Sequence, residues 1–349
     1  MTTHGIYAIH GDHNLSYPGY VVLTFGIGHD PNHRDGHDFT QYANTPIARL
    51  NNGYGNQGTI PLPEHYPAFA QRCARFVAAS RGCSRWIIGN EPNHSQEQKD
   101  DQPITPTMYA RCYDLCRAWI HSVAGHENDE VLVAAVAPWN PETQYEGNPG
   151  GNWIAYFDDV QSLIDGCDGF ALHTYTRAQT PDAVVSDDRM GAPFSDYHNG
   201  FRTYRDWMNA IWVDLRGLPV YITEFCVAGV PWDNANTECI QAAYAEIDAW
   251  NQRYPERPIR CLAVYRWAID RWSFHDKPAV IADFMRAADQ GYTLPVEVEP
   301  PGPEPPEDAL DALTERVDEL EAELHQQAAV IKALYARVQA GAVGLAGGG

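Results

Sequence analysis

The sequence has no long apolar run and few basic residues. None of its uninterrupted apolar stretches in 349 residues approaches the roughly 18 residues that a membrane-spanning helix needs, so we expect no membrane partner. Lys and Arg total 24 against 46 Asp and Glu, which gives a formal net charge of −22. This acidic balance argues against nucleic acid or an anionic membrane surface as a partner. It leaves open an uncharged substrate such as a sugar.

The sequence also lacks a metal-binding cysteine pattern and a signal peptide. Cys112 and Cys116 are four residues apart, but none of the other six cysteines forms a second pair with zinc-finger spacing. We therefore expect mostly buried thiols, no metal and no other cofactor. The N-terminal segment MTTHGIYAIHGDH has neither a basic nor a long apolar region. At face value the expected location is the cytoplasm, although a trimmed chain or a piece of a larger exported chain stays open.

Apolar runs alternate with helical spacing along most of the chain. Runs typical of buried strands lie at 5–9, 20–28, the first half of 46–55, 86–88, 131–140, 169–175, 218–226 and 259–270. Helical spacing follows the third to eighth runs, at 64–80, 105–123, 152–164, 197–215, 236–252 and 279–289, and is poor after the first two. This alternation predicts an α/β fold, a closed (β/α)8 TIM barrel over residues 1–293. An open doubly wound sheet is the alternative, but the sequence has no G-x-G-x-x-G or P-loop motif.

The C-terminal part differs in composition from the barrel. Residues 294–307 contain six prolines among acidic residues, which predicts an extended Pro/Glu-rich linker. Residues 308–340 carry a heptad repeat, which predicts a coiled-coil helix and a homo-oligomer. A single amphipathic helix folded back on the barrel is the alternative, and the number of strands stays open. Residues 341–349 are predicted to be a disordered Gly-rich tail. The heptad places Leu310, Val317, Leu324, Ile331 and Val338 at a, and Leu313, Leu320, Gln327 and Leu334 at d.

The segment WIIGNEPN, at 86–93, ends a buried strand on a carboxyl group. Its apolar run stops at Gly89, and Glu91 follows where Pro92 prevents further ladder pairing. A partly desolvated carboxyl at a strand tip suits a proton donor, whereas the alternative is an ordinary Glu in a salt bridge. A second carboxyl, Glu224, ends another apolar run in LPVYITEFC. The pair favours the functional interpretation.

In a (β/α)8 barrel the polar residues at the C-terminal strand ends form the active site. Here they provide two carboxyls, several hydrogen-bond donors and aromatic rings. Such a set suits a sugar, whose hydroxyl groups need hydrogen-bond partners and whose ring faces stack on flat aromatic surfaces. In chain order these residues are His10, Asp12, His29, Arg49, Asn51, Asn90, Glu91, Trp139, Asn140, His173, Tyr175, Glu224 and Trp267.

Asn-Glu-Pro at 90–92 and Thr-Glu-Phe at 223–225 resemble the retaining glycoside hydrolases of the (β/α)8 4/7 superfamily (clan A), such as cellulases and other β-glycanases. The resemblance covers roughly residues 1–292. It implies that Glu91 is the general acid/base after the fourth strand and Glu224 the nucleophile after the seventh. It also implies that Asn90 binds the sugar 2-hydroxyl and that Trp267 is a stacking platform.

Three further substrate-binding residues follow from the same resemblance. His173 and Tyr175 match the clan's His-x-Tyr after strand six, where Tyr would hydrogen-bond the nucleophile. Arg49 matches the clan's nucleophile-pairing arginine, although our third strand departs slightly from its expected place. Trp139 would contribute an aromatic surface. The expected function is a retaining β-glycosidase or β-glycanase acting on an oligo- or polysaccharide, with a slight preference for endo action; sugar and linkage stay open.

Two other functions compete with this one. The histidines of HGDH (10–13) and HDPNHRDGHD (29–38) suggest a metal-dependent hydrolase on the same barrel, but of the histidine positions that such a site needs only His173 fits well. A catalytically inactive barrel that binds carbohydrate as a multimer is the second alternative. It would bind oligosaccharide without cleaving it.

Overall fold

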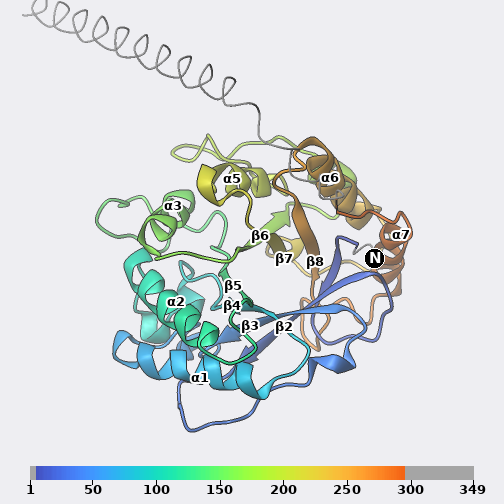
Figure 1. The fold of residues 1–349 in the computed structure, drawn as a ribbon. Helices are drawn as coiled ribbons and strands as arrows, with labels where there is room; N and C mark the ends of the chain where they lie inside the picture. The colour runs from blue at the N-terminus through green and yellow to red at the C-terminus, as the bar shows by residue number, and fades with distance from the viewer. Residues whose placement is uncertain (1–4, 295–349) are drawn as a thin grey trace, which may run out of the picture. The chain divides into compact units, whose positions relative to one another are not determined.

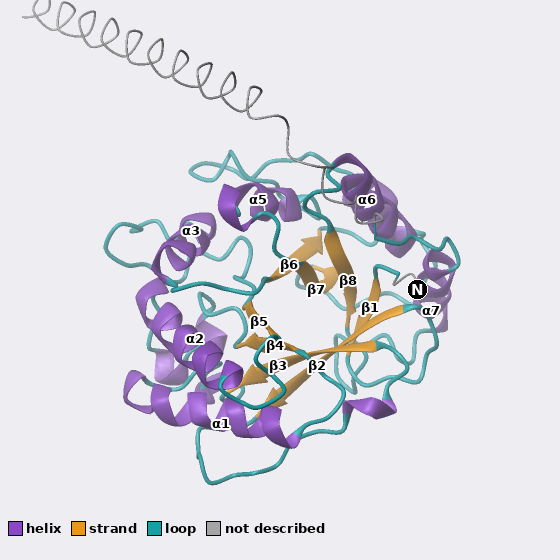
Figure 2. Cartoon of the chain, viewed as in Figure 1, coloured by secondary structure: helices purple, strands orange, loops and turns teal. Residues whose placement is uncertain are grey.

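The structure, a computed structural model, describes residues 5–294 as a closed barrel of eight parallel strands in chain order. Helices surround the strands (Figures 1 and 2), and the predicted TIM barrel is confirmed. The predicted linker from its second residue on, the coiled coil and the tail, together with the homo-oligomer they imply, fall on residues 295–349, outside the described residues. The strands are β1 (Tyr7–His10), β2 (Gly19–Gly26), β3 (Thr45–Asn51), β4 (Arg85–Ile88), β5 (Glu130–Val133), β6 (Phe170–Thr176), β7 (Val220–Val227) and β8 (Ile259–Tyr265).

The α-helices follow strands three to eight, as the helical spacing predicts. The links from β1 to β2 and from β2 to β3 contain only one short 3-10 helix, η1 (Phe39–Gln41). None of the helices within residues 5–294 is both long and apolar enough to cross a membrane. The helices are α1 (Tyr66–Ala79), α2 (Pro106–His121), α3 (Trp153–Leu163), α4 (Pro181–Val184), α5 (Thr203–Ala210), α6 (Cys239–Arg253) and α7 (Pro278–Ala288).

Two predicted elements are shorter than their sequence patterns. The helix expected at 197–215 is reduced to α5, and the strand expected at 131–140 ends at Val133. Beyond Val133 side chains take the backbone N–H groups that a ladder would use. Ala134 donates to the Tyr109 hydroxyl (2.6 Å) and Ala137 to the Asn93 side chain (2.7 Å). The chain therefore leaves the sheet although its composition stays apolar.

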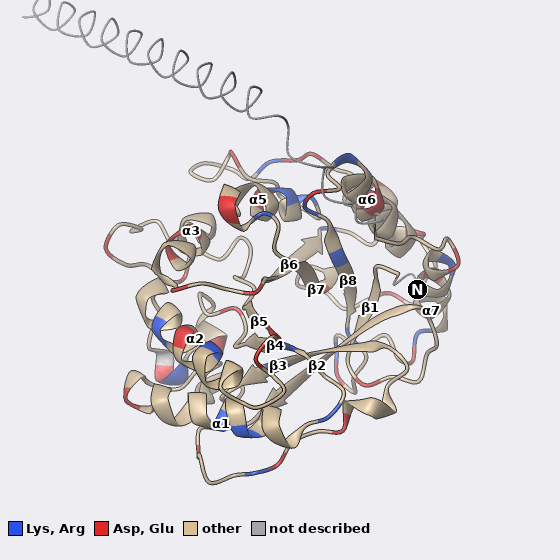
Figure 3. Cartoon of the chain, in the orientation of Figure 1, with Lys and Arg blue, Asp and Glu red and all other residues tan. Residues whose placement is uncertain are grey.

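The outer faces of the strands are buried under the helices. Trp86 of β4 is fully buried against Phe39 and Phe76, and its indole N–H donates to Asp129 (2.6 Å). It thus packs away from the barrel mouth. The eight cysteines are free thiols, and all but Cys167 are buried, as expected. Charged residues lie mainly on the helices and loops, while the strands are mostly uncharged (Figure 3).

A polar cluster fills the N-terminal end of the barrel interior. The Arg85 guanidinium donates to the Tyr221 hydroxyl (3.0 Å), which donates to Glu130 (2.7 Å). The ring of Tyr20 packs edge-on against Tyr221 at 5.7 Å. Because β2, β4 and β7 are not neighbours in the barrel, these contacts cross its interior. They close the end of the barrel opposite the predicted active site.

Candidate active site

Glu224 lies near the C-terminal end of β7, where the barrel interior opens. Its Oε1 accepts a hydrogen bond from Arg49 Nη1 at 2.7 Å, and both side chains are buried. A register shift in β6 between Leu172 and His173 places His173 opposite Glu224 in the β6–β7 pair. Such irregularities re-aim side chains near functional sites. Residues far apart in the sequence are thereby brought together around one carboxylate.

Glu91 follows β4 in a strained backbone conformation. Its φ is +36°, which costs a non-glycine residue on the order of 1–3 kcal/mol. The Glu91 N–H donates to Ala135 O (2.9 Å), which holds the turn in place. The preceding Gly89 has φ +82°, and a Cβ there would stand 3.3 Å from Thr59 Oγ1. The turn thus needs glycine at 89, and it aims Glu91 toward Glu224.

His173 links Glu91 to Arg49 and is held in one tautomer. Its Nε2 lies 3.0 Å from Arg49 Nη2, and because a guanidinium only donates, this nitrogen must accept. The proton of a neutral ring is then on Nδ1, which donates to Glu91 Oε1 at 2.7 Å. The ring is fully buried, so this orientation is fixed by packing as well as by hydrogen bonds.

Tyr175 stands between the two carboxyl groups. Its hydroxyl is 3.0 Å from Glu91 Oε1 and 3.1 Å from Glu224 Oε2. One oxygen of Glu91 and one of Glu224 lie within 4.8 Å of each other. Burial, together with the charges of Glu224 and Glu91, raises the pKa of Tyr175 well above its usual value. Tyr175 therefore keeps its proton and can donate it to one carboxylate at a time.

The surroundings of Glu224 keep it ionised. Burial alone would raise the pKa of Glu224, but its electrostatic interactions with His173, Arg49 and His10 (3.9 Å) outweigh burial and hold the pKa well below its usual range. Of these three groups, Arg49 is the one that stays charged when both histidines are neutral. Burial, with the charge of Arg49 next in effect, lowers the pKa of His10 to about 3. A neutral His10 donates from Nδ1 to the Thr223 carbonyl (3.2 Å). Glu224 is thus a buried carboxylate with a fixed cation beside it.

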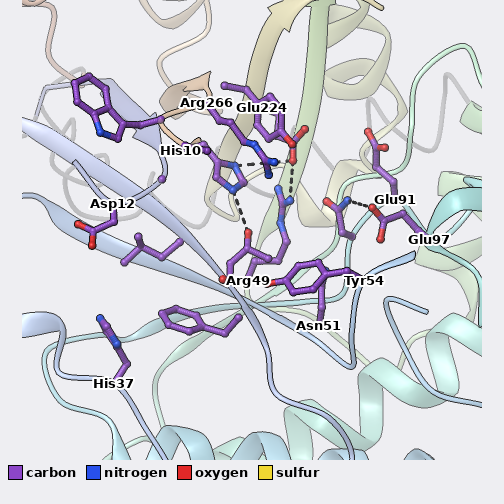
Figure 4. A pocket seen from close by; sticks show the side chains of 18 of the residues that line it. His10, Asp12, His37, Arg49, Asn51, Tyr54, Glu91, Glu97, Glu224 and Arg266 are labelled. Atoms are coloured by element: carbon purple, nitrogen blue, oxygen red, sulfur yellow. Dashed lines mark hydrogen bonds and ion pairs between the residues drawn. The ribbon is translucent and has the colours of Figure 1, made fainter. Parts of the chain in front are cut away.

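A cleft extends on both sides of the carboxyl pair. One half, of about 720 Å³, is lined by Asn51, Asn90 and Trp267 among others, and we name it the Asn90 half (Figure 4). The other, of about 630 Å³, is lined by Trp139 and Tyr175 among others, and we name it the Trp139 half. Residues that line both halves are Glu91, Glu224 and Tyr265.

Most of the residues expected at the mouth line this cleft. His10, Asp12 and Arg49 line the Asn90 half, and Asn140 lines the Trp139 half. His173 lies beneath the carboxyl pair as described above. His29 is different: its ring stacks on His65 and its Nδ1 contacts Asn52 Oδ1 (2.7 Å), away from the lining residues. His29 was expected at the barrel mouth only because it follows an apolar run, and the structure places it outside the cleft lining.

The structure adds cleft residues that the sequence pattern did not indicate. Glu97 ends the 3-10 helix η4 (Ser95–Glu97) and lines the Asn90 half. Arg177 stacks over the Trp139 ring at 3.7 Å, so one face of that ring is covered. Tyr265 lies within the eighth apolar run, but the run extends to residue 270, and the structure shows that the strand ends at Tyr265. Glu97 lies in a polar loop with no periodic signal to distinguish it from surface acids.

Glu91, His173 and Glu224 are the group within residues 5–294 whose donor atoms are close enough for a metal ion. The contacts in this group do not suit a cation. Arg49 already places a positive charge 2.7 Å from Glu224, and His173 Nδ1 is engaged by Glu91 at 2.7 Å. A second cation would have to displace Arg49 and break the His173–Glu91 hydrogen bond. The chemistry of the donor set thus disfavours a metal centre here.

No protein-family model matches the sequence, and no curated protein does. Solved structures similar to this chain include glycoside hydrolases. A family 39 glycoside hydrolase from Bacteroides cellulosilyticus WH2 is 16% identical with a TM-score of 0.47; the match covers 77% of this chain but only 58% of that one. A family 128 (subgroup II) endo-β-1,3-glucanase from Sorangium cellulosum is 16% identical with a TM-score of 0.43, covering 79% of this chain and 91% of that one. The Clostridial cellulose synthase subunit Z from Clostridioides difficile is 11% identical with a TM-score of 0.45, covering 77% and 87% respectively.

Proposed function

We propose that this chain is a retaining β-glycoside hydrolase in which Glu224 is the nucleophile and Glu91 the general acid/base. The observation that carries this proposal is the pair of carboxyl groups bridged by the Tyr175 hydroxyl, with oxygens within 4.8 Å. Retaining enzymes hold their carboxyls about 5–5.5 Å apart, whereas inverting enzymes need about 6.5–9.5 Å to admit a water. The spacing here supports direct attack by a carboxylate.

In the first step Glu224 attacks the anomeric carbon while Glu91 donates a proton to the departing glycosidic oxygen. The C–O bond to the leaving sugar breaks, and a covalent glycosyl-enzyme forms. Arg49 favours Glu224 as the nucleophile, because its positive charge stabilises the ionised Glu224 carboxylate before attack. In the second step Glu91 removes a proton from water, which releases the sugar with its original anomeric configuration.

The hydrogen bonds of Tyr175 fit this division of labour. Its single hydroxyl proton can be donated to Glu224 Oε2 when Glu224 is ionised. Across the 3.0 Å contact, Glu91 can then donate the proton it carries as general acid to the Tyr175 oxygen. The arrangement therefore supports one ionised and one protonated carboxyl, as the mechanism requires.

The substrate we propose is an oligo- or polysaccharide of neutral sugars. The cleft continues on both sides of the carboxyl pair, so sugar units fit on both sides of the bond that breaks. Trp267 in the Asn90 half and Trp139 in the Trp139 half offer aromatic surfaces for sugar rings. An inactive carbohydrate-binding barrel would use the same cleft, and only turnover separates the two.

The first experiment is hydrolysis of aryl β-glycosides and β-glucans, followed by proton NMR of the anomer formed first. We expect the β-anomer first, since two inversions restore the configuration. Release of the α-anomer first would show inversion and end the assignment of Glu224 as nucleophile. Binding of oligosaccharide without any cleavage would replace the proposed enzyme by a binding protein.

A second experiment separates the roles of the two carboxyls. Glu91→Ala should lose most activity on substrates with poor leaving groups but keep glycosyl-enzyme formation on dinitrophenyl β-glycosides, which need no acid assistance. Mass spectrometry should then detect the glycosyl-enzyme on Glu224. Glu142→Gln, a change in a partly exposed carboxylate outside the cleft lining, is the matched control. Equal loss on both substrate classes would contradict an acid/base role for Glu91.

A further inference from the structure

Three buried oxygen atoms in the Asn90 half accept no hydrogen bond. Nine buried side-chain polar atoms within residues 5–294 lack a partner, and four of them belong to residues of the Asn90 half: the acceptors Asn51 Oδ1, Asn90 Oδ1 and Glu97 Oε2, and the donor Arg266 Nε. The three acceptor residues line the cleft beside Glu91. An unsatisfied buried polar group costs about 1–3 kcal/mol, so three acceptors and one donor in one cleft point to a ligand that mainly donates hydrogen bonds and also accepts one, as hydroxyl groups can.

Glu97 is fixed in this wall by its neighbours. Its Oε1 accepts from Asn90 Nδ2 at 3.1 Å. Thr59 clamps the same two residues, because its N–H donates to Glu97 O (2.8 Å) and its Oγ1 accepts from the Asn90 N–H (2.5 Å). Figure 4 shows Glu97 beside Glu91, on the side of the cleft away from His10. With the Asn90 NH₂ group directed to Glu97, the free atom of that amide is its oxygen.

We propose that Glu97 is a positioning residue that orients the Asn90 amide, so that Asn51, Asn90 and Glu97 together accept hydrogen bonds from the hydroxyls of a neutral sugar. The inference rests on the proposed function and names the substrate class of this half of the cleft. A sugar carboxylate placed against these three acceptor oxygens would be repelled, although Arg266 lines the same half. Hydroxyl groups, which donate, satisfy each of them.

The protonation state of Glu97 changes which hydrogen-bonding groups Asn90 and Glu97 present to the cleft. Burial raises the pKa of Glu97 to about 7, while the hydrogen bond from Asn90 works against the rise. A protonated Glu97 can donate to Asn90 Oδ1, and the amide then turns its NH₂ group to the cleft. The acceptor wall is therefore complete when Glu97 is ionised. The other ionisable groups around Glu97 are Glu91, Arg49, Glu224 and Tyr54, with Lys99 on the adjacent η5 (Lys99–Asp101) paired to Asp100.

The test measures sugar binding in a background where neither catalytic carboxyl titrates. Glu91→Gln/Glu224→Gln protein, checked for folding by circular dichroism, is titrated calorimetrically with cellopentaose and laminaripentaose from pH 5.5 to 8.5. We expect binding to tighten about tenfold as the pH rises through the pKa of Glu97, the worth of one hydrogen bond to a charged group. In this background that inflection lies below pH 7, because the charges of Glu91 and Glu224, which help to raise the pKa of Glu97, are removed. Adding Glu97→Gln should remove the inflection, and adding Glu142→Gln should leave it in place. An inflection that survives Glu97→Gln overturns the inference.

Kinetics of the otherwise intact chain provide an independent measurement. Glu97→Gln should lower kcat/KM about tenfold for 4-nitrophenyl β-D-glucoside, with part of the loss in kcat, since hydrogen bonds to the 2-hydroxyl strengthen in the transition state. The same variant should narrow the preference for this glucoside over 4-nitrophenyl β-D-glucuronide. An unaltered preference, with hydrolysis intact, overturns the inference and leaves the proposed function standing. If the chain hydrolyses none of these substrates but shows the Glu97-dependent change in binding, the role of Glu97 stands and the proposed hydrolase function falls. If the chain binds no sugar at all, both proposals fall.

Discussion

The two ends of the barrel interior contain the same kinds of side chain, but these side chains have different roles at each end. At the N-terminal end Arg85, Tyr221 and Glu130 satisfy one another. At the C-terminal end Arg49 and Glu224 are similarly paired. That end, however, opens into a cleft whose wall keeps three acceptors without donors. The Arg85–Glu130 pair thus serves the fold, because its hydrogen-bond partners belong to the barrel itself. The Arg49–Glu224 pair instead faces a cleft that can hold a ligand.

Burial separates the two pairs further. The side chains of Arg85 and Glu130 are 22% and 24% exposed, whereas those of Arg49 and Glu224 are 4% and 8% exposed. Desolvation makes a buried charge costly unless its partner is fixed. The pair at the mouth is thus the more demanding one to maintain, although it lies at the open end. This cost is expected of a site organised for reactivity.

The largest expected effect comes from removing one carboxylate at each end. Glu224→Gln should lower kcat by at least about 10⁴-fold, because no other group is placed to form the glycosyl-enzyme. Glu130→Gln, the matched change, should leave kcat within about twofold and cost about 1 kcal/mol of stability. Both variants are to be compared by initial rates and by urea unfolding. Similar rate losses in the two would erase the functional distinction between the ends.

Removing the two arginines should separate the ends by stability. Arg49→Met leaves Glu224 buried without its cation and should cost about 3–5 kcal/mol. Arg85→Met leaves a partly hydrated Glu130 and should cost about 1 kcal/mol. Adding Glu224→Gln to Arg49→Met should recover most of the loss, which identifies the stranded charge as its cause. Equal losses from the two single variants in urea unfolding would mean that burial does not distinguish the pairs.

The sequence predicted the strand ends better than it predicted the loops. Glu91 and Glu224 could be placed because each ends an apolar run, and a closed parallel barrel gathers such ends at one face. Arg49 was located at the right strand, and the structure brings it to Glu224. The early end of β5 could not be predicted. It depends on the Tyr109 hydroxyl and the Asn93 side chain, which belong to other parts of the chain. They accept the backbone N–H groups of Ala134 and Ala137, which would otherwise be free for strand pairing.

Glu97 illustrates why part of the site was missed. It lies in the loop segment HSQEQKDD, where acids and amides carry no spacing signal. Its burial arises from Thr59, which belongs to a different loop and binds both Glu97 and Asn90. Local sequence cannot report such a contact between two loops. His29, conversely, follows an apolar run yet packs on His65 outside the cleft lining, so strand-end position is not sufficient either.

Glu97 should also give the protein a characteristic pH dependence of stability, opposite in sign to that expected for Glu142. Its pKa of about 7 in the folded chain lies above the usual 4.5 because burial penalises the charged form. The unfolded chain therefore releases this proton first, so stability falls as the pH rises from about 4.5 and the loss is complete above about 7. The difference corresponds to about 3 kcal/mol.

Glu97→Gln should consequently stabilise the protein more at pH 8 than at pH 5, measured by urea unfolding at both pH values. Glu142→Gln should have the opposite sign. Although partial burial would raise the pKa of Glu142, hydrogen bonds from Ser95 and Asn140 hold it below its usual value, so its carboxylate stabilises the fold above the unfolded pKa. The same pH dependence in both variants would show that Glu97 is not held against ionisation.

The two bridging tyrosines give the smallest expected effects and the closest match. Tyr175→Phe removes the hydroxyl shared by Glu91 and Glu224, and loss of a hydrogen bond to a charged group should lower kcat by about 10- to 100-fold. Tyr221→Phe removes the hydroxyl shared by Arg85 and Glu130, and it should cost about 1 kcal/mol of stability with kcat unchanged. Each variant is measured by both readouts. If Tyr175→Phe lost only stability, the bridge at the mouth would be structural like its counterpart, and the two ends of the barrel would differ in exposure rather than in function.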